Sequence, residues 1–322
     1  MPANITVNNG VAEMMTADGR DAWHGLGARL SQVATAQEAI EAANMGWEVG
    51  MREVFIQTPS GQFIEVTDKK AVTRMDNGKV FGVFSNQYTP LQNRDAFTFF
   101  DSVVGAGEAI YHTAGTLAGG SRIWILAKLP GDLKLSDTDV LERYILLANS
   151  HDGSLAVTMK PTTVRVVCNN TLSVALGGET NKLFRAVHTS SVMQRVNQAR
   201  ETLGLQEAYF ANVMRGIERL ADERMTQAAA DEFLVELFGQ EENREAISTR
   251  MQNQIDTVGN LFVKGTGNHG VNRWDMLNAV TEFVDHKRTK DDDKRLDAAW
   301  FGGGKDLKQK AWNLLLPAGT LS

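Results

Sequence analysis

Cysteine is almost absent from this chain of 322 residues, which contains only Cys168. A single cysteine excludes an internal disulfide and a cysteine-based zinc cluster, and it fits a reducing, cytoplasmic location. The chain also lacks an apolar run close to the ~20 residues that a membrane span needs, so we expect no membrane partner. Its first residues, MPANITVNNGVAEMM, have neither a basic start nor an apolar core and therefore do not resemble a secretory signal.

An excess of positive charge is also missing, since 33 Lys and Arg stand against 39 Asp and Glu and the net charge is -6. This balance excludes a protein that coats nucleic acid with its whole surface, but it is compatible with a local basic patch. The segment 143–200 contains seven basic residues and two acidic ones, a local charge of +5. Positive charge concentrated on an acidic protein predicts an anionic partner.

Turn signals divide the first two thirds of the chain into short β-rich runs. Asn-Gly at 77–78 lies between two such runs, and it is the strongest short hairpin signal because both residues tolerate positive φ. Further turns are predicted at 118–121 and 150–153, and helical spacing appears at 35–45, with Thr35 as N-cap, and at 93–104. The pattern predicts an α+β fold: an antiparallel β-meander or hairpin sheet with packed helices.

From about residue 190 the pattern becomes mostly helical. We therefore divide the chain into an α+β domain with a basic groove, 1–190, and a helical domain, 191–322. Apolar residues recur with spacings of four and three from Val192 to Leu220, which predicts one long helix packed along a partner, with Gly204 as a candidate break. This seam either belongs to the protein's own core, the simpler reading, or joins copies in a homo-oligomer.

The basic residues of the middle third form a candidate nucleic-acid interface. Lys160 shares its strand parity with Thr158 and Thr162, whereas Arg165 has the opposite parity, and Pro161 leaves a common face undecided. Basic and hydroxyl groups suit phosphate oxygens, and a neighbouring aromatic ring can stack on an unpaired base. The residues predicted to bind are Arg122, Trp124, Lys160, Arg165, Lys182 and Arg185, with His188 as an accessory. An ordinary solvated surface is the simpler alternative.

Acidic residues and histidine suggest a different class of protein, a metal-dependent nuclease or phosphoesterase. Glu282, Asp285 and His286 occupy positions i, i+3 and i+4 of one predicted helix and could face one metal ion. The pair His151-Asp152 would add a general acid and base. A polar helix face and an ordinary turn explain these residues more simply, and no nucleophile lies beside the pair in sequence. We therefore predict no catalytic residue, no metal site and no cofactor.

The loop Gly265–Gly270 matches G-x-G-x-x-G literally and precedes a predicted helix. A dinucleotide site also needs a strand before the glycines, a parallel strand after the helix and an acid about 20 residues on. The flanking residues are helical or charged, so we predict a turn between two helices.

Short motifs between residues 23 and 315 carry a resemblance to a known family. They are WHGLG (23–27), YTPLQN (88–93), AG (114–115) with GG (119–120), NSHDGS (149–154), VRVVCNNTL (164–172), HT (188–189), NAVTEFVDH (278–286) and LKQKA (307–311). Through them the chain resembles uncharacterised phage- and plasmid-related proteins grouped as a domain of unknown function. The resemblance implies a mobile-element or phage origin and supplies no catalytic residues.

The hairpin, strand and helix predicted over 141–176 are similar in order to the core of single-strand annealing proteins such as the Red-beta, Erf and RecT groups. This is a likeness of architecture alone. Together with the basic segment it predicts a non-enzymatic single-stranded DNA-binding and annealing protein of a phage or plasmid, oligomeric and active in recombination or replication. The alternatives are the metal-dependent enzyme and a phage interaction or anti-defence protein without affinity for nucleic acid.

Overall fold

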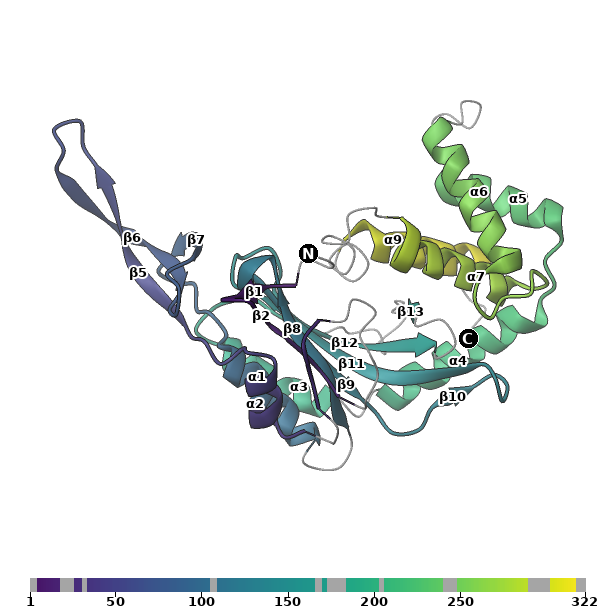
Figure 1. The fold of residues 1–322 in the computed structure, drawn as a ribbon, viewed down its shortest axis with the longest axis horizontal. Coiled ribbons are helices and arrows are strands. Elements are labelled where there is room, and N and C mark those ends of the chain that lie inside the picture. Colours follow the sequence, from purple (N-terminus) through teal and green to yellow (C-terminus); the bar gives the residue numbers. More distant parts are fainter. Residues whose placement is uncertain are drawn as a thin grey trace.

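The computed structural model describes residues 5–17, 26–30, 34–104, 109–165, 170–172, 184–202, 206–239, 248–288 and 302–316. Over these ranges the chain has the predicted α+β fold, with antiparallel sheets and with more of the helices towards the C-terminus (Figure 1). The fold-class prediction is confirmed. None of the described helices is long and apolar enough to cross a membrane.

A nine-stranded sheet lies at the centre, in the order β13-β12-β11-β9-β8-β3-β4, with β10 paired to β11 and β14 to β12. Its described pairs are antiparallel except the short parallel pair β3 and β4. The strands are β3 (Met14–Thr16), β4 (Ala28–Arg29), β8 (Ile110–Leu117), β9 (Arg122–Lys128), β10 (Leu133–Lys134), β11 (Val140–Ser150), β12 (Val157–Arg165), β13 (Asn170–Leu172) and β14 (Phe184–Ala186). The predicted turn at 118–121 joins β8 to β9, where Ala118, Gly119 and Gly120 adopt positive φ.

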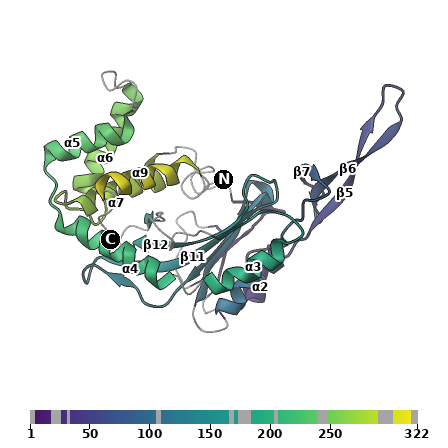
Figure 2. The ribbon, with the colours of Figure 1, turned by 180° about the vertical axis from the view of Figure 1, so that it is seen from behind.

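One face of this sheet packs on helices α1 (Ala36–Ala42), α2 (Asn93–Val104) and α3 (Val192–Thr202), which lie together on one side of it in both views (Figures 1 and 2). Alternate apolar residues of β9 and β11, including Ile125 and Leu147, belong to the main core on this side. The start of α1 follows the predicted local chemistry: Thr35 and Glu38 form a capping box that satisfies backbone N–H groups at the helix end.

The described part of the apolar seam from Val192 to Leu220 lies in two helices. Helix α3 ends at Thr202 and α4 spans Gln206–Asp222, while Gly204, the predicted break, lies outside the described residues. Val196, Phe210 and Ile217 are at most 1% exposed and belong to the main core. The described part of the seam is thus an internal packing surface, and its two helices lie on either side of the candidate break in the sequence.

The remaining helices extend this core. They are α5 (Gln227–Phe238), α6 (Thr249–Lys264), α7 (Arg273–Glu282), the π-helix η5 (Phe283–Lys287) and α9 (Gly303–Leu315). Trp274 of α7 donates to the Asp139 carboxylate, 2.9 Å away, beside the start of β11. One apolar cluster contains residues of the central sheet and of these helices, so the segments before and after residue 190 share a core. The domain boundary at 190 stays a prediction.

A second sheet projects from the body as an arm, built from β5 (Val49–Gln57), β6 (Phe63–Arg74) and β7 (Val80–Ser85) (Figures 1 and 2). The predicted Asn-Gly turn joins β6 to β7, and Gly78 has the expected positive φ of 74°. At the base of the arm, the side-chain amide of Gln92 accepts from the N–H of Val49 and donates to its carbonyl, both at 2.9 Å. A small antiparallel hairpin of β1 (Val7–Asn8) and β2 (Val11–Ala12) precedes β3 in the chain.

Arg74 anchors the arm to the body. Its guanidinium is 1% exposed, binds the fully buried carboxylate of Glu13 through two nitrogens, and also contacts Asp76 at 2.7 Å. It lies 4.1 Å from the centre of the Trp47 ring. A charge buried this deeply is tolerable only because it is paired and hydrogen-bonded.

Candidate functional site

The register of the central sheet places several of the predicted binding residues on one face. Residues directly opposite one another on neighbouring strands share a face. Trp124, Ala148, Thr158 and Arg185 form one such row across β9, β11, β12 and β14, and Leu126, Leu146 and Lys160 form the next. Arg122 lies two residues from Trp124 on β9 and so faces the same way. We call this surface, opposite the face that packs on α1, α2 and α3, the Lys160 face.

Pro161 does not reset the register of β12, because β11 pairs with β12 from Leu141↔Arg165 to Ala148↔Thr158 without a shift. Lys160, Thr158 and Thr162 therefore share a face, as their parity predicts. Position 165 has the opposite parity and pairs with Leu141 and Asn170 at the end of the strand. The side chain of Arg165 and the whole of Lys182 lie outside the described part of the structure.

Lys160 lies among other cations. Its side chain is mostly buried, and Lys305 and Lys308 of α9 are close enough to act on its charge. Burial and these two lysines lower the pKa of Lys160 to about 8. Lys308 is itself buried and pairs with the Asp285 carboxylate at 2.5 Å. Lysines from a strand and from a helix far apart in sequence thus lie near one another, and Lys308 among them is paired with a carboxylate. Positive charge gathered in this way suits a phosphate or another anion.

Two other predicted residues extend the positive charge along the same face. Arg185 is exposed on β14, opposite Thr158. Arg122 is half-buried at the end of β9, and its Nε donates to the Ser154 hydroxyl at 3.1 Å. Burial opposes ionisation of the neighbouring Asp152, but hydrogen bonds from Ser154 and the charge of Arg122 outweigh it and lower the pKa of Asp152. Arg122 is therefore partly neutralised by this loop, whereas Arg185 faces solvent.

Trp124 does not form a stacking platform. Its side chain is 2% exposed and belongs to a second apolar cluster, together with Leu126 and Tyr144 of the sheet and with Ile5 and Met14 of the N-terminal segment. A ring covered on this scale cannot stack on a base in this conformation. Its role in the described structure is to hold the N-terminal segment against the sheet.

Three motifs that carry the family resemblance meet at one place, where the arm joins the sheet. The Tyr88 ring stacks on the His188 ring at 4.9 Å, and its hydroxyl donates to the Ser150 carbonyl at 3.4 Å. His151 contacts the Asn93 side-chain oxygen through Nε2 at 3.1 Å, and its backbone N–H donates to the Ser121 carbonyl at 2.8 Å. This junction links residues 88–93, 149–154 and 188–189 with Ser121, which directly follows the motif at 119–120. Only the shared resemblance of the motifs signalled it in the sequence.

His151 is fully buried in this junction, between the rings of Trp47 and Phe81, each 5.4 Å away. Burial, and secondarily the nearby His188, lowers the pKa of His151 to about 3. Burial also lowers the pKa of His188, which contacts the Leu155 carbonyl at 3.4 Å. A neutral, enclosed imidazole explains why His151 belongs to the packing of the turn rather than to an exposed acid–base pair with Asp152.

The three residues of the metal alternative have other partners. The Glu282 carboxylate accepts from the Thr266 N–H at 3.1 Å and so closes the loop after α6, and Asp285 pairs with Lys308. Among the described residues, no group of three histidine, cysteine or acidic side chains is arranged to hold a metal ion. His286 contributes to no such group.

The loop Gly265–Gly270 joins α6 to α7, as predicted. The residue before the first glycine is the last of a helix, and Gly265 donates back to the Leu261 carbonyl at 2.7 Å as its cap. The strand that a dinucleotide fingerprint requires is replaced by this helix.

Comparison with known proteins identifies the family but no activity. A sequence model described as "Domain of unknown function (DUF932)" matches residues 80–300, more than half of the chain, and the chain therefore belongs to this family. No curated protein matches the chain. No solved structure matches it either.

Proposed function

We propose that this protein binds single-stranded DNA through the Lys160 face, without catalysing a reaction. Its family, a domain of unknown function, assigns it no activity. The observation that supports it best is that Lys305 and Lys308 of α9 lie close enough to Lys160, on this face, to act on its charge. Arg185 and Arg122 lie on the same face and add positive charge at its two sides. Phosphate oxygens need donors and positive charge at intervals, and this arrangement supplies both without base specificity.

The finer parts of the proposal are the preference for unpaired strands, the annealing of complementary strands, and work in recombination or replication of a phage or plasmid. They rest on the likeness of strand and helix order to annealing proteins and on the motif resemblance. Oligomers would raise the local concentration of bound strands and favour their pairing. The seam of α3 and α4 is occupied by the protein's own core, so such an oligomer has to use another surface.

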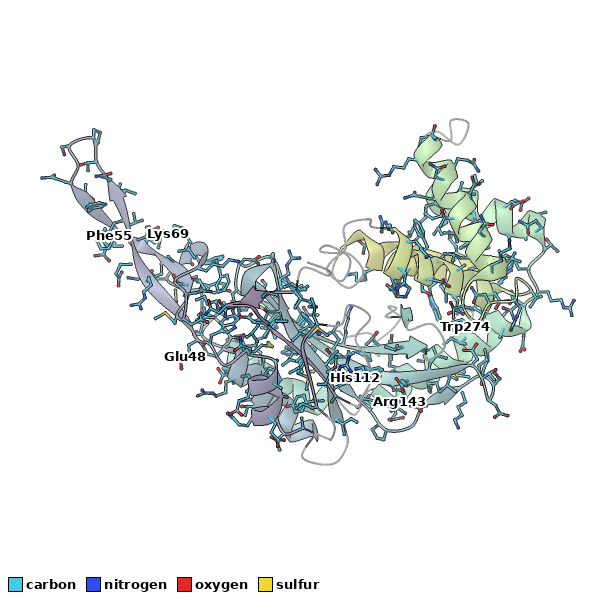
Figure 3. All side chains as sticks on the ribbon, viewed as in Figure 1. Glu48, Phe55, Lys69, His112, Arg143 and Trp274 are labelled. Atoms are coloured by element: carbon cyan, nitrogen blue, oxygen red, sulfur yellow. The ribbon has the colours of Figure 1, made fainter. Side chains whose placement is uncertain are left out.

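The test is binding of a fluorescent 30-nucleotide single strand, followed by anisotropy between 50 and 200 mM salt. Lys160→Met removes the charge and keeps most of the buried volume. We expect affinity to fall about tenfold for all sequences and the salt slope to drop by about one unit. Lys69→Ala on the arm is the matched control, because it also removes one positive charge but lies far from the Lys160 face (Figure 3), and it should leave binding unchanged.

The pH dependence gives a second measurement on the same protein. Lys160 carries its charge below a pKa of about 8, so binding should weaken between pH 7 and pH 9, and Lys160→Met should lose this dependence. An unchanged melting temperature shows that the variant is folded. Absence of salt-sensitive binding at 50 mM salt, or equal weakening by Lys69→Ala, would refute the proposal and favour an interaction protein without affinity for nucleic acid.

A further inference from the structure

The far part of the arm exposes large apolar side chains. We call residues 49–70 of β5 and β6 the arm ribbon. Near its tip Phe55 is 53% exposed, Phe63 70% and Ile64 51%, and Ile56 is exposed to a similar extent. Figure 3 shows Phe55 on the arm, well away from the central sheet. Leaving these groups in water forfeits the stabilisation of about 25 cal/mol per Å² that burial would bring, and such patches mark interaction sites.

The apolar residues occupy both faces of the ribbon. Ile56 pairs with Ile64, so the two side chains share one face, whereas Phe63 pairs with Gln57 and Phe55 with Glu65 on the other. A flat protein surface would cover only one of these faces. A partner that continues the sheet extends both faces at once.

The ribbon also has an open edge. In the described sheet β5 pairs only with β6, and beyond Val49, where Gln92 satisfies the backbone, its outer edge faces no strand. β7 pairs with β6 only from Lys69 to Thr73, so the far part of the ribbon has two strands. A two-stranded ribbon is marginally stable in water, and an unpaired strand edge is a template for another strand.

The charges of the ribbon suit a second copy of the same ribbon. Arg52, Lys69 and Lys70 balance Glu53, Glu65 and Asp68, whereas the whole chain has a net charge of -6. The ribbon is thus a part of the molecule that a second copy can approach without like-charge repulsion, and it offers no net attraction for phosphate. Lys70 contacts the carboxylates of Glu53 and Glu65 within the ribbon, so these charges have partners in each copy.

We propose that the arm ribbon pairs antiparallel with the ribbon of a second copy along their β5 edges. The two β5 strands then lie at the centre of one continuous sheet, and the apolar side chains near each tip pack beside the base of the other arm. The contact uses the same surface on both copies and closes as a dimer. It is independent of the proposed binding of DNA, because it uses no residue of the Lys160 face.

The first experiment measures the mass of the purified chain alone by sedimentation between about 1 and 100 µM, a range that covers typical dimer affinities. We expect a concentration-dependent dimer. Phe55→Lys combined with Ile64→Lys should weaken it at least tenfold, with an unchanged melting temperature. Val263→Lys on α6 is the matched control, since Val263 is 50% exposed, and it should leave the dimer intact.

The second experiment tests the pairing edge. Single cysteines are placed in turn at positions 52 to 56 in a Cys168→Ser background. One β5 position, or two adjacent ones, should form a disulfide between copies under mild oxidation, because a strand paired antiparallel with itself meets its own copy near one residue. A wild-type chain that stays monomeric, a dimer that survives the double substitution, or the absence of any disulfide along β5 would overturn the proposal.

Discussion

The arm and the central sheet are both mainly antiparallel, and β11 of the central sheet is similar in length to β5 and β6 of the arm, but the two sheets differ in what covers them. β11 is buried along most of its length, with α3 and α4 on one face and the N-terminal segment on part of the other. β5 and the first half of β6 are mostly exposed. Strand formation therefore needs only local pairing and turn chemistry, whereas the free energy of the fold comes from the faces that other elements cover.

The largest effect should come from separating the arm from the body. Arg74→Ala leaves the Glu13 carboxylate buried without its guanidinium, and we expect the free energy of unfolding to fall by about 3–5 kcal/mol. Urea denaturation measures the change. Arg52→Ala, on the exposed part of the arm, should change stability by less than about 0.5 kcal/mol. Equal effects of the two substitutions would mean that the arm is not anchored through Arg74.

The comparison of the two sheets is sharpened by equivalent truncations. Leu147→Ala in β11 removes a side chain that is 1% exposed and should destabilise the protein by about 2–5 kcal/mol. Ile64→Ala in the arm removes one that is 51% exposed and should cost less than about 0.5 kcal/mol in the monomer. Thermal unfolding at low protein concentration measures the loss of stability caused by each substitution. A large loss for Ile64→Ala in the monomer would contradict the exposure of Ile64 on the arm.

The smallest effect at neutral pH concerns His151, at the junction of the two sheets. Its pKa is about 3 in the folded protein and about 6.5 in an unfolded chain. Between these values the unfolded chain binds the extra proton, so stability should fall as the pH decreases from about 6.5 towards 3. His151→Gln should make this fall shallower, as measured by urea unfolding at pH 7, 5.5 and 4.5. Parallel pH profiles for both proteins would show that His151 is accessible to protons.

Features set by neighbours in sequence were predicted correctly. The Asn-Gly turn at Gly78, the N-cap Thr35 and the helix-to-helix loop at Gly265–Gly270 each depend on a few adjacent residues. These features need no knowledge of the distant chain.

Features set by distant contacts were missed. Alternation identifies the face of Trp124, but only the approach of Ile5 and Met14 buries it. The sequence predicts His151 only as a turn residue, whereas in the fold rings from the base of the arm enclose it. Lys308 belongs to the motif LKQKA, but only the tertiary fold brings it and Lys305 close to Lys160.

The contact between Gln92 and Val49 has a consequence for any strand that joins the arm. A side-chain amide there imitates a neighbouring strand and uses both backbone groups of Val49. An added strand must therefore stop short of Val49. This shortens the free edge of β5 at the base of the arm and reduces the number of registers in which two strands can pair. Gln92 thus limits how far along β5 an added strand can pair.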